Sequence, residues 1–404
     1  MSEEQESLPL ESISPSEGKV PPKVNSLREL IDRVTGRHLD ITQVQEDAGI
    51  ADVVPFPFLA IVGQNEMKLA LLLTMINPSI GGVLLIGPRG TGKTTAVRSL
   101  VDLLPEVPKS LCYFGCLPED VEVGGLDAIC PDCAKKYAAG TPIAEMDRAR
   151  LVELPLNARL EDVIGGVDER AVIHERYALR RGILAQADRN LLYVDEVNLL
   201  KDEVIDAILD ASAQGHYVVR RGPVSATFRS RFALIGSMNP EEGRLRPQIM
   251  DRFGLRVLVR GLPDPSDRMR AYQYVHAYNL NPRSMVAQFS EATTEAQQEI
   301  QVARDVLPQV VLPDRIAELG LAMVKHLKID SLRAEITLFE SARAHAIADG
   351  RLEVEENDLQ VVAPIALRLR RSDFMSKFFS NQDTEEQQVS SLLGELFPTD
   401  GDRE

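Results

Sequence analysis

Length, composition and charge place this chain among globular proteins. Its 404 residues are enough for two or three domains of ordinary size. Hydrophobic residues make up 44% and charged residues 26% of the chain, which excludes a wholly disordered protein and a disulfide-rich scaffold. The 61 acidic residues exceed the 45 basic ones, giving a formal net charge of −16. Because binding to nucleic acid draws on excess Lys and Arg, we expect no nucleic-acid partner.

The two ends of the chain carry much of the negative charge. Residues 1–24 are predicted to form an acidic, flexible segment rich in Glu, Ser and Pro, and residues 381–404 an acidic tail. The N-terminus lacks the basic and apolar regions of a secretory signal. The longest apolar stretch, Leu69–Ile76, is far too short to span a bilayer. The sequence therefore predicts a cytoplasmic protein without a membrane partner.

Residues 25–262 are predicted to form an α/β domain. A short helix is expected after Ser26, and Gly36 is well placed to end it. Further along, solidly apolar runs typical of buried parallel strands alternate with amphipathic helical patterns. The expected strands are Val83–Ile86, Leu191–Val194 and Phe232–Ile235, and the expected helices are Lys93–Leu104 and Glu203–Gln214. This alternation predicts a doubly wound parallel sheet with helices on both faces.

A phosphate-binding loop follows the first expected strand and opens a helix. The pattern G-x-x-x-x-G-K-[ST] is matched in full by Gly87, Pro88, Arg89, Gly90, Thr91, Gly92, Lys93 and Thr94. Glycines let successive backbone N–H groups turn toward phosphates, which the helix N-terminus also favours. Lys93 is expected near the β- and γ-phosphates, and the Thr94 hydroxyl is expected to ligate Mg²⁺. The motif predicts a site for a nucleoside triphosphate.

All four cysteines of the chain lie in one stretch after this loop. Cys112, Cys116, Cys130 and Cys133 are spaced C-x₃-C-x₁₃-C-x₂-C. Two close pairs separated by a loop are typical of a tetrahedral Cys₄ zinc site. We therefore expect a small insertion, at about residues 112–133, that holds a structural Zn²⁺. A redox-switchable pair of thiols and chemically inert thiols are the alternatives.

Polar residues follow the later strands of the α/β domain. Asp195 and Glu196 come directly after Leu191–Val194, at the strand end where doubly wound sheets bind ligands. Asp195 is expected to hold Mg²⁺ through its water shell, and Glu196 to orient and polarise the attacking water. Asn239 follows the next strand and is either a γ-phosphate contact or a turn residue. Arg252, after a helical stretch, is either a surface ion-pair partner or an arginine that reaches a neighbouring subunit's nucleotide.

Residues 263–380 are predicted to form a second, all-helical domain. The stiff junction Leu262-Pro263-Asp264-Pro265 precedes it, and no strand pattern follows. The expected helices are Asp267–Tyr278, Glu291–Val306, Asp314–His326, Arg333–Asp349 and Glu356–Leu369. Ser331 is expected to cap the fourth helix. Arg333, at the start of that helix, is either a surface ion-pair partner or a residue that folds back over the phosphates.

These motifs, in this order, resemble those of the AAA+ ATPases. More narrowly, three segments resemble the small ATPase subunit of magnesium chelatase: NLLYVDEVNLL (Asn190–Leu200), GSMNPEEGRLRPQIMDRFGL (Gly236–Leu255) and SLRAEITL (Ser331–Leu338). The similarity runs from about Phe56 to Arg370. By this resemblance Asp195 and Glu196 match the Walker B acids and Asn239 matches sensor 1. Arg252 matches the arginine finger and Arg333 matches sensor 2.

The resemblance also implies an activity, cofactors and partners. It implies a hexameric ring that binds ATP and Mg²⁺ at each subunit boundary and hydrolyses the ATP. The expected partners are a second AAA+ subunit with an integrin-like metal-binding domain and a large porphyrin-binding subunit. Together they insert Mg²⁺ into protoporphyrin IX for chlorophyll and bacteriochlorophyll synthesis, and the present chain supplies the motor.

Two alternatives share the same ATPase domain. The first is a MoxR-type chaperone ATPase that acts on a partner with a metal-binding domain, which a porphyrin-chelation assay would distinguish. The second is a DNA-bound transcription activator, which requires a recognition helix, usually with a basic face. The C-terminal part of this sequence has neither a basic cluster nor a recognition-helix pattern, so we disfavour it.

Overall fold

A computed structural model describes residues 54–370 of the chain, apart from 168–178, 222–223 and 244. The predicted acidic segment 1–24, the short helix after Ser26 and the acidic tail 381–404 lie outside the described residues.

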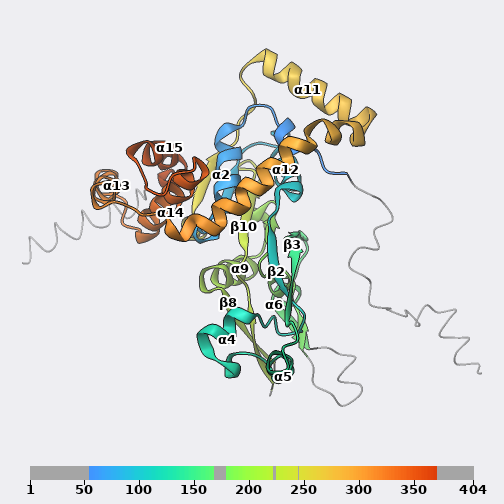
Figure 1. The fold of residues 1–404 in the computed structure, drawn as a ribbon. Coiled ribbons are helices and arrows are strands. Elements are labelled where there is room, and N and C mark those ends of the chain that lie inside the picture. Colours follow the sequence, from blue (N-terminus) through green and yellow to red (C-terminus); the bar gives the residue numbers. More distant parts are fainter. Residues whose placement is uncertain (1–53, 168–178, 222–223, 244, 371–404) are drawn as a thin grey trace, which may run out of the picture. The chain divides into compact units, whose positions relative to one another are not determined.

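A five-stranded parallel sheet forms the centre of the α/β region (Figure 1). Its strand order is β11-β1-β10-β7-β4. The strands are β1 (Val83–Ile86), β4 (Leu151–Leu154), β7 (Leu191–Val194), β10 (Ala233–Met238) and β11 (Leu255–Leu258). Every residue of β1, β7 and β10 is buried, as the apolar runs predicted. The order makes β1, β10 and β7 neighbours, although they are far apart in the sequence.

Helices cover both faces of this sheet and create two cores. Alternate residues of β1 point to opposite faces, so Val83 and Leu85 join one core while Leu84 and Ile86 join the other. The helices of the α/β region are α2 (Asn65–Ile76), α3 (Lys93–Arg98), α6 (Leu160–Ile164), α8 (Ile183–Gln186), α9 (Asp202–Gln214) and α10 (Pro247–Arg252). The prediction of a doubly wound sheet is therefore confirmed.

The helix that follows the phosphate-binding loop is shorter than predicted. α3 ends at Arg98, and the chain continues as a 3₁₀ helix over Ser99–Leu103. The Ser99 hydroxyl donates a hydrogen bond to the carbonyl of Thr95 at 2.6 Å. The Ser99 backbone N–H bonds to the same carbonyl, and this residue forms the C-cap of α3.

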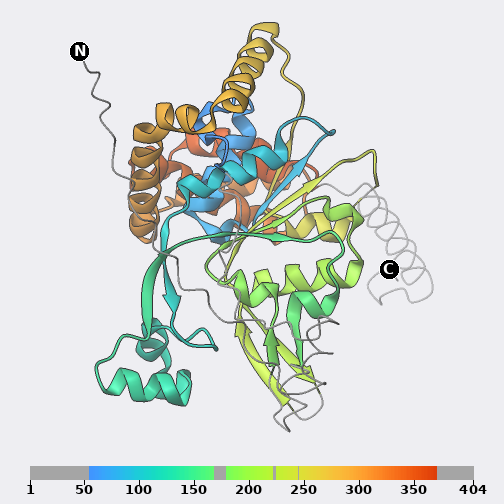
Figure 2. The same cartoon turned by 90° about the vertical axis from the view of Figure 1, so that its right-hand side faces the viewer.

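Three antiparallel ribbons extend from the α/β region and were not predicted. They are β2 (Glu106–Ser110) with β3 (Ala144–Arg148), β5 (Gly165–Val167) with β6 (Leu179–Arg181), and β8 (His216–Arg221) with β9 (Val224–Arg229). Residues 111–143, which we call the cysteine module, lie between β2 and β3. They contain α4 (Pro118–Gly124) and α5 (Pro131–Ala138). Figure 2 shows the β2–β3 ribbon leading to this module.

The remaining described chain is helical, as predicted. Its helices are α11 (Pro265–Leu280), α12 (Pro282–Val306), α13 (Asp314–His326), α14 (Leu332–Ala348) and α15 (Glu356–Leu367). α12 starts earlier than expected because Pro282 occupies its first turn and the Asn281 side chain accepts a hydrogen bond from the Ser284 N–H. α12 and α14 pack against α2 (Figure 1). Among the described residues, no helix is long and apolar enough to cross a bilayer.

Asp251 joins the helical region to the sheet. Its carboxylate accepts hydrogen bonds from Arg256, at 3.2 Å, and from Arg370, at 3.0 Å, and both arginines are buried. Ser331, predicted to cap α14, forms no capping hydrogen bond and instead donates to Asp251 at 2.9 Å. Burial alone would raise the pKa of Asp251, but the Ser331 hydroxyl and the two guanidinium charges lower it overall.

A second buried carboxylate organises the end of the helical region. Asp358, at the start of α15, is fully buried. It accepts two hydrogen bonds from Arg351, at 2.6 and 2.7 Å, and lies 2.6 Å from Nδ1 of His345. Burial acts to raise the pKa of Asp358, but the bonds from Arg351, the Glu355 backbone and His345 outweigh burial and lower it.

Candidate nucleotide site

The predicted phosphate and metal residues meet at one edge of the sheet. β1, β10 and β7 are parallel neighbours, so their carboxyl ends lie side by side. The Gly87 N–H, just after β1, donates to the carbonyl of Met238 at 3.1 Å, next to Asn239. The pairing of Gly236 with Val194 brings Ser237 level with Asp195. Strand order therefore brings together the phosphate-binding loop Gly87–Thr94 (the P-loop), Asn239 and the acid pair Asp195 and Glu196, as expected for a doubly wound fold.

The P-loop depends on glycine at two kinds of position. A Cβ on Gly87 would lie 2.1 Å from the carbonyl oxygen of Val259, so only glycine fits between β1 and β11. Gly92 has a φ of 85°, in the left-handed region that favours glycine, and it precedes the first residue of α3. These residues carry the loop tightly from the strand into the helix N-terminus, where backbone N–H groups favour anions.

Lys93 is anchored under the loop. Its buried ammonium donates hydrogen bonds to the carbonyls of Gly87, at 2.7 Å, and Pro88, at 2.8 Å. Desolvation lowers the pKa of Lys93, and the nearby Asp195, Glu242 and Glu196 carboxylates act in the opposite direction. A cation held among carbonyls and carboxylates at this position suits contact with a polyphosphate.

Hard oxygen ligands gather around Asp195. Its carboxylate accepts hydrogen bonds from the Tyr193 hydroxyl at 2.8 Å, from the Thr94 hydroxyl at 3.4 Å and from the Ser237 hydroxyl. The Tyr193 hydroxyl also lies 3.2 Å from the Thr94 hydroxyl. Burial raises the pKa of Tyr193, so this phenol stays a neutral donor at physiological pH. Thr94 and Asp195, predicted as Mg²⁺ ligands, thus lie together with the hydroxyl and carboxylate oxygens that Mg²⁺ prefers.

Glu196 projects toward the P-loop from a strained backbone. It has a φ of 49°, which is uncommon for a residue other than glycine and recurs at functional sites. Its backbone N–H donates to the Ser237 hydroxyl at 3.2 Å. Arg89 of the P-loop lies 3.5 Å from the Glu196 carboxylate and also pairs with Glu242. These contacts keep the second acid at the edge of the loop.

Asn239 is buried beside this edge. Its side-chain oxygen accepts a hydrogen bond from the Glu241 N–H at 3.2 Å, and its carbonyl accepts one from the Asn198 side chain at 3.3 Å. Asn239 therefore shapes the turn after β10, as one of the two interpretations of the sequence predicts, and its contact with a γ-phosphate stays a prediction.

Arg252 and Arg333 lie near each other at the other end of the strands, where the strands begin. At this edge, the N–H of Gly254, just ahead of β11, donates a hydrogen bond to the carbonyl of Gly81, just ahead of β1. About 13 Å of strand therefore separates the two edges. Arg252 ends α10 and pairs with Asp210 of α9 at 2.8 Å, and Arg333 lies 3.8 Å from Asp251.

The two arginines line a shared cleft of about 940 Å³ at that edge. Arg333 thus contacts Asp251 and not the described P-loop of its own chain. This agrees with the interpretation of Arg333 as an ion-pair partner and not with the one that folds it back over the phosphates of its own chain.

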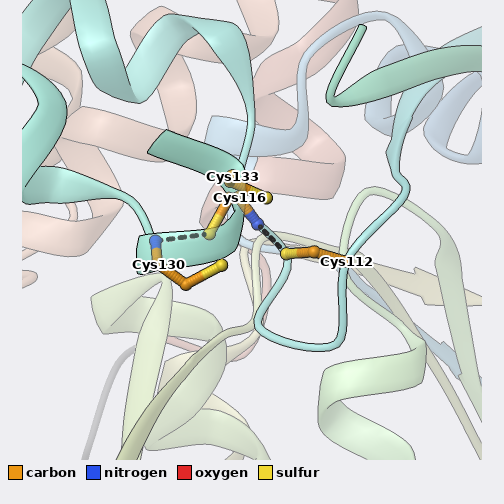
Figure 3. Close-up of side chains that lie close together, drawn as sticks. All are labelled: Cys112, Cys116, Cys130 and Cys133. Carbon is orange, nitrogen blue, oxygen red and sulfur yellow. Dashed lines mark hydrogen bonds between the residues drawn. The ribbon is translucent and has the colours of Figure 1, made fainter. Parts of the chain in front are cut away.

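The four cysteines, predicted to form one metal site, come together in the fold. Their sulfur atoms all lie within 4.8 Å of one another in the cysteine module (Figure 3). None of the four forms a disulfide.

Several site residues were missed from the sequence. Tyr193 lies two residues before Asp195 and Ser237 two before Asn239, so the period of two along a strand could have identified both. No local signal pointed to the pairing of Glu242 with Arg89 or to the contacts that converge on Asp251, because strand order and domain packing create them.

Comparison with known proteins agrees with this geometry. The family model described as an AAA domain matches residues 79–222, and the AAA lid domain matches residues 324–392. The "Magnesium-chelatase subunit ChlI homolog" of Methanocaldococcus jannaschii is 44% identical over 323 residues, covering 79% of this chain and 87% of that protein. The "Magnesium-chelatase 38 kDa subunit" of Acidiphilium rubrum is 41% identical over 317 residues, covering 78% and 90%.

A solved structure from Cytophaga hutchinsonii shares the fold. It is 17% identical, has a TM-score of 0.50, and the match covers 82% of this chain and 91% of that one. Fold, site and family models together define an AAA+ protein with a lid domain. Within that class, the identity over most of both chains shows that this chain belongs to the magnesium-chelatase subunit ChlI family.

Proposed function

We propose that this chain is the ATP-hydrolysing motor of a magnesium chelatase. The observation that carries the proposal is the convergence of Lys93, Thr94, Asp195 and Glu196 at one edge of the sheet. Thr94 and Asp195 are the proposed Mg²⁺ ligands, and Mg²⁺ would neutralise charge on the phosphates. Lys93 binds the terminal phosphates, Glu196 orients the attacking water, and Asn239 contacts the γ-phosphate or that water.

The proposed active unit is a ring of copies, a hexamer by family resemblance. Arg252 and Arg333 lie at the edge of the sheet away from their own P-loop, so each is proposed to act on the nucleotide of the adjoining copy. Arginine supplied from a neighbour stabilises charge on the transferred phosphoryl group. Both arginines line one cleft of about 940 Å³, which is large enough to receive a segment of another copy and supports a site shared between copies.

The proposed work of the ring is to drive Mg²⁺ insertion into protoporphyrin IX. Relatives that match most of this chain are named as subunits of magnesium chelatase, which supports partner subunits for this chain too. We propose a second AAA+ subunit with a metal-binding domain and a large porphyrin-binding subunit as those partners, in the cytoplasm. The proposed cofactors are ATP and Mg²⁺ at the P-loop and Zn²⁺ at the four cysteines.

A reconstituted chelation assay tests this function. The chain is combined with its two cognate partner subunits, protoporphyrin IX, ATP and Mg²⁺, and formation of the magnesium porphyrin is followed by fluorescence. Insertion is expected with the unaltered chain and not with the matched Glu196→Gln variant. Phosphate release without insertion would contradict the chelatase assignment and favour a MoxR-type chaperone.

A further inference from the structure

The cysteine module, residues 111–143, is too small to fold on apolar packing alone. Neither of the two large cores of the described chain includes any of its residues. Its own core consists of four buried side chains, Cys116, Ile129, Cys133 and Ile143, and half of these are cysteines. Burying a side chain gains about 1.5–3 kcal/mol, whereas ordering each residue costs about 1.5 kcal/mol. Units of fewer than about 40 residues usually need a metal or disulfides for this reason.

The four sulfur atoms lie close enough together to share one metal ion. They all lie within 4.8 Å of one another, and a zinc ion with Zn–S bonds of about 2.3 Å requires sulfur atoms about 3.8 Å apart. Cys112 and Cys116 come from the loop after β2, and Cys130 and Cys133 come from the start of α5 (Figure 3). Two separate chain segments therefore need to close by no more than about 1 Å to enclose a metal.

Hydrogen-bond donors point at these sulfur atoms. The Cys116 N–H donates to Sγ of Cys112 at 3.3 Å, and the Cys130 N–H donates to Sγ of Cys116 at 3.2 Å (Figure 3). The Ser110 hydroxyl lies 3.4 Å from Sγ of Cys112. Such donors stabilise thiolates, which is the form that binds a metal.

The module also docks on the α/β region through the helix that follows Cys116. Glu119 of α4 pairs with Arg189 at 2.6 Å, just ahead of β7, and Asp120 pairs with Arg229 of β9. Both acidic residues lie in the first turn of α4, which begins at Pro118, two residues after Cys116. A metal bound by Cys116 therefore fixes both the fold of the module and the position of its docking helix.

We infer that the four cysteines bind one Zn²⁺, and that this ion keeps the module folded and α4 docked on the α/β region. All-thiolate ligands select zinc over the Mg²⁺ that oxygen ligands hold at the P-loop. The site is closed, with four protein ligands, so the zinc is structural and takes no part in ATP hydrolysis.

Metal analysis of the full chain tests the first half of this inference. Protein purified without chelator is expected to contain about one zinc per chain, and its four thiols react with a thiol reagent only after the metal is extracted. Cobalt substitution is expected to give the charge-transfer bands of a tetrathiolate site. Less than about half an equivalent of zinc, with four freely reactive thiols, would overturn the inference.

Two variants separate loss of metal from loss of folding. Cys112 is half-buried, so Cys112→Ser is expected to leave the α/β region folded and to lose most of the zinc. Thr141→Ala, which alters an exposed side chain of the same module, is the control and is expected to keep the zinc. Full zinc content in Cys112→Ser would contradict the four-cysteine site.

Hydrogen exchange tests the docking. Extraction of zinc is expected to speed amide exchange in residues 111–143 by at least about tenfold while β1 and β7 stay protected. Unchanged exchange in the module would refute the docking role. Neither measurement depends on ATP hydrolysis, so the zinc inference and the proposed motor function can fail separately.

Discussion

Replacing Arg252 by Ala gives the sharpest test of a nucleotide site shared between copies. The Arg252 side chain is 30% exposed, and its described partners are Asp210 at 2.8 Å and Asp206 at 3.8 Å. Such a partly exposed pair contributes about 0–1 kcal/mol to folding, so the denaturation temperature should fall by no more than a few degrees.

The expected effect on turnover is much larger. An arginine supplied to a transferring phosphoryl group contributes about 10³–10⁵-fold in rate, or about 4–7 kcal/mol of transition-state stabilisation. We therefore expect Arg252→Ala to bind ATP with near-normal affinity and to release phosphate at least about 10³-fold more slowly. The assays are nucleotide binding by fluorescence and steady-state phosphate release.

Arg246→Ala is the matched control, because Arg246 precedes the same helix and pairs with Asp202 and Asp206 at its surface. It should lose a similar small amount of folding free energy and keep its turnover. If Arg252→Ala and Arg246→Ala hydrolyse ATP equally well, Arg252 is only a surface ion-pair partner.

Mixing two inactive variants decides whether Arg252 acts on a neighbour. Arg252→Ala keeps an intact P-loop, and Lys93→Ala keeps an intact arginine. In rings assembled at random from equal amounts of the two variants, about a quarter of the interfaces join an intact P-loop to an intact Arg252. Activity should therefore reappear in the mixture. If the mixture stays as inactive as its components under conditions where rings form, the shared-site argument is refuted.

Further outcomes follow from the site and the lid. Lys93→Ala should lose ATP binding in a direct binding assay, whereas Glu196→Gln should bind ATP and hydrolyse it about 10²–10⁴-fold more slowly. Retained turnover in Glu196→Gln would remove that residue from the mechanism. Asp358→Asn should destabilise the fold by about 3 kcal/mol in denaturant titrations, because it breaks a buried pair with Arg351. The lowered folded-state pKa of Asp358 means that its stabilisation exists above about pH 3.9 and is lost as the pH falls through the lower folded value. If Asp358→Asn and the unaltered chain unfold over the same acidic pH range, this role of Asp358 is contradicted.

The sequence alone determined the local chemistry of the nucleotide site. A strand, a glycine-rich turn and a helix start are consecutive in the chain, so the P-loop from Gly87 to Thr94 was readable without tertiary information. The same holds for the acids after β7 and for most of the helices in the lid, since their apolar periodicity is local.

Only the tertiary structure decided at which end of the sheet strands each site residue lies. The sheet order β11-β1-β10-β7-β4 places Arg252 away from the P-loop, and no local pattern encodes that order. Ser331 has the residue type and position of a helix cap, yet its hydroxyl bonds to Asp251 from the distant α10. The three two-stranded ribbons escaped prediction because their strands are mostly exposed and lack the continuous apolar runs of β1 and β7. Contacts between distant segments depend on packing geometry, which a single sequence specifies only through the whole fold.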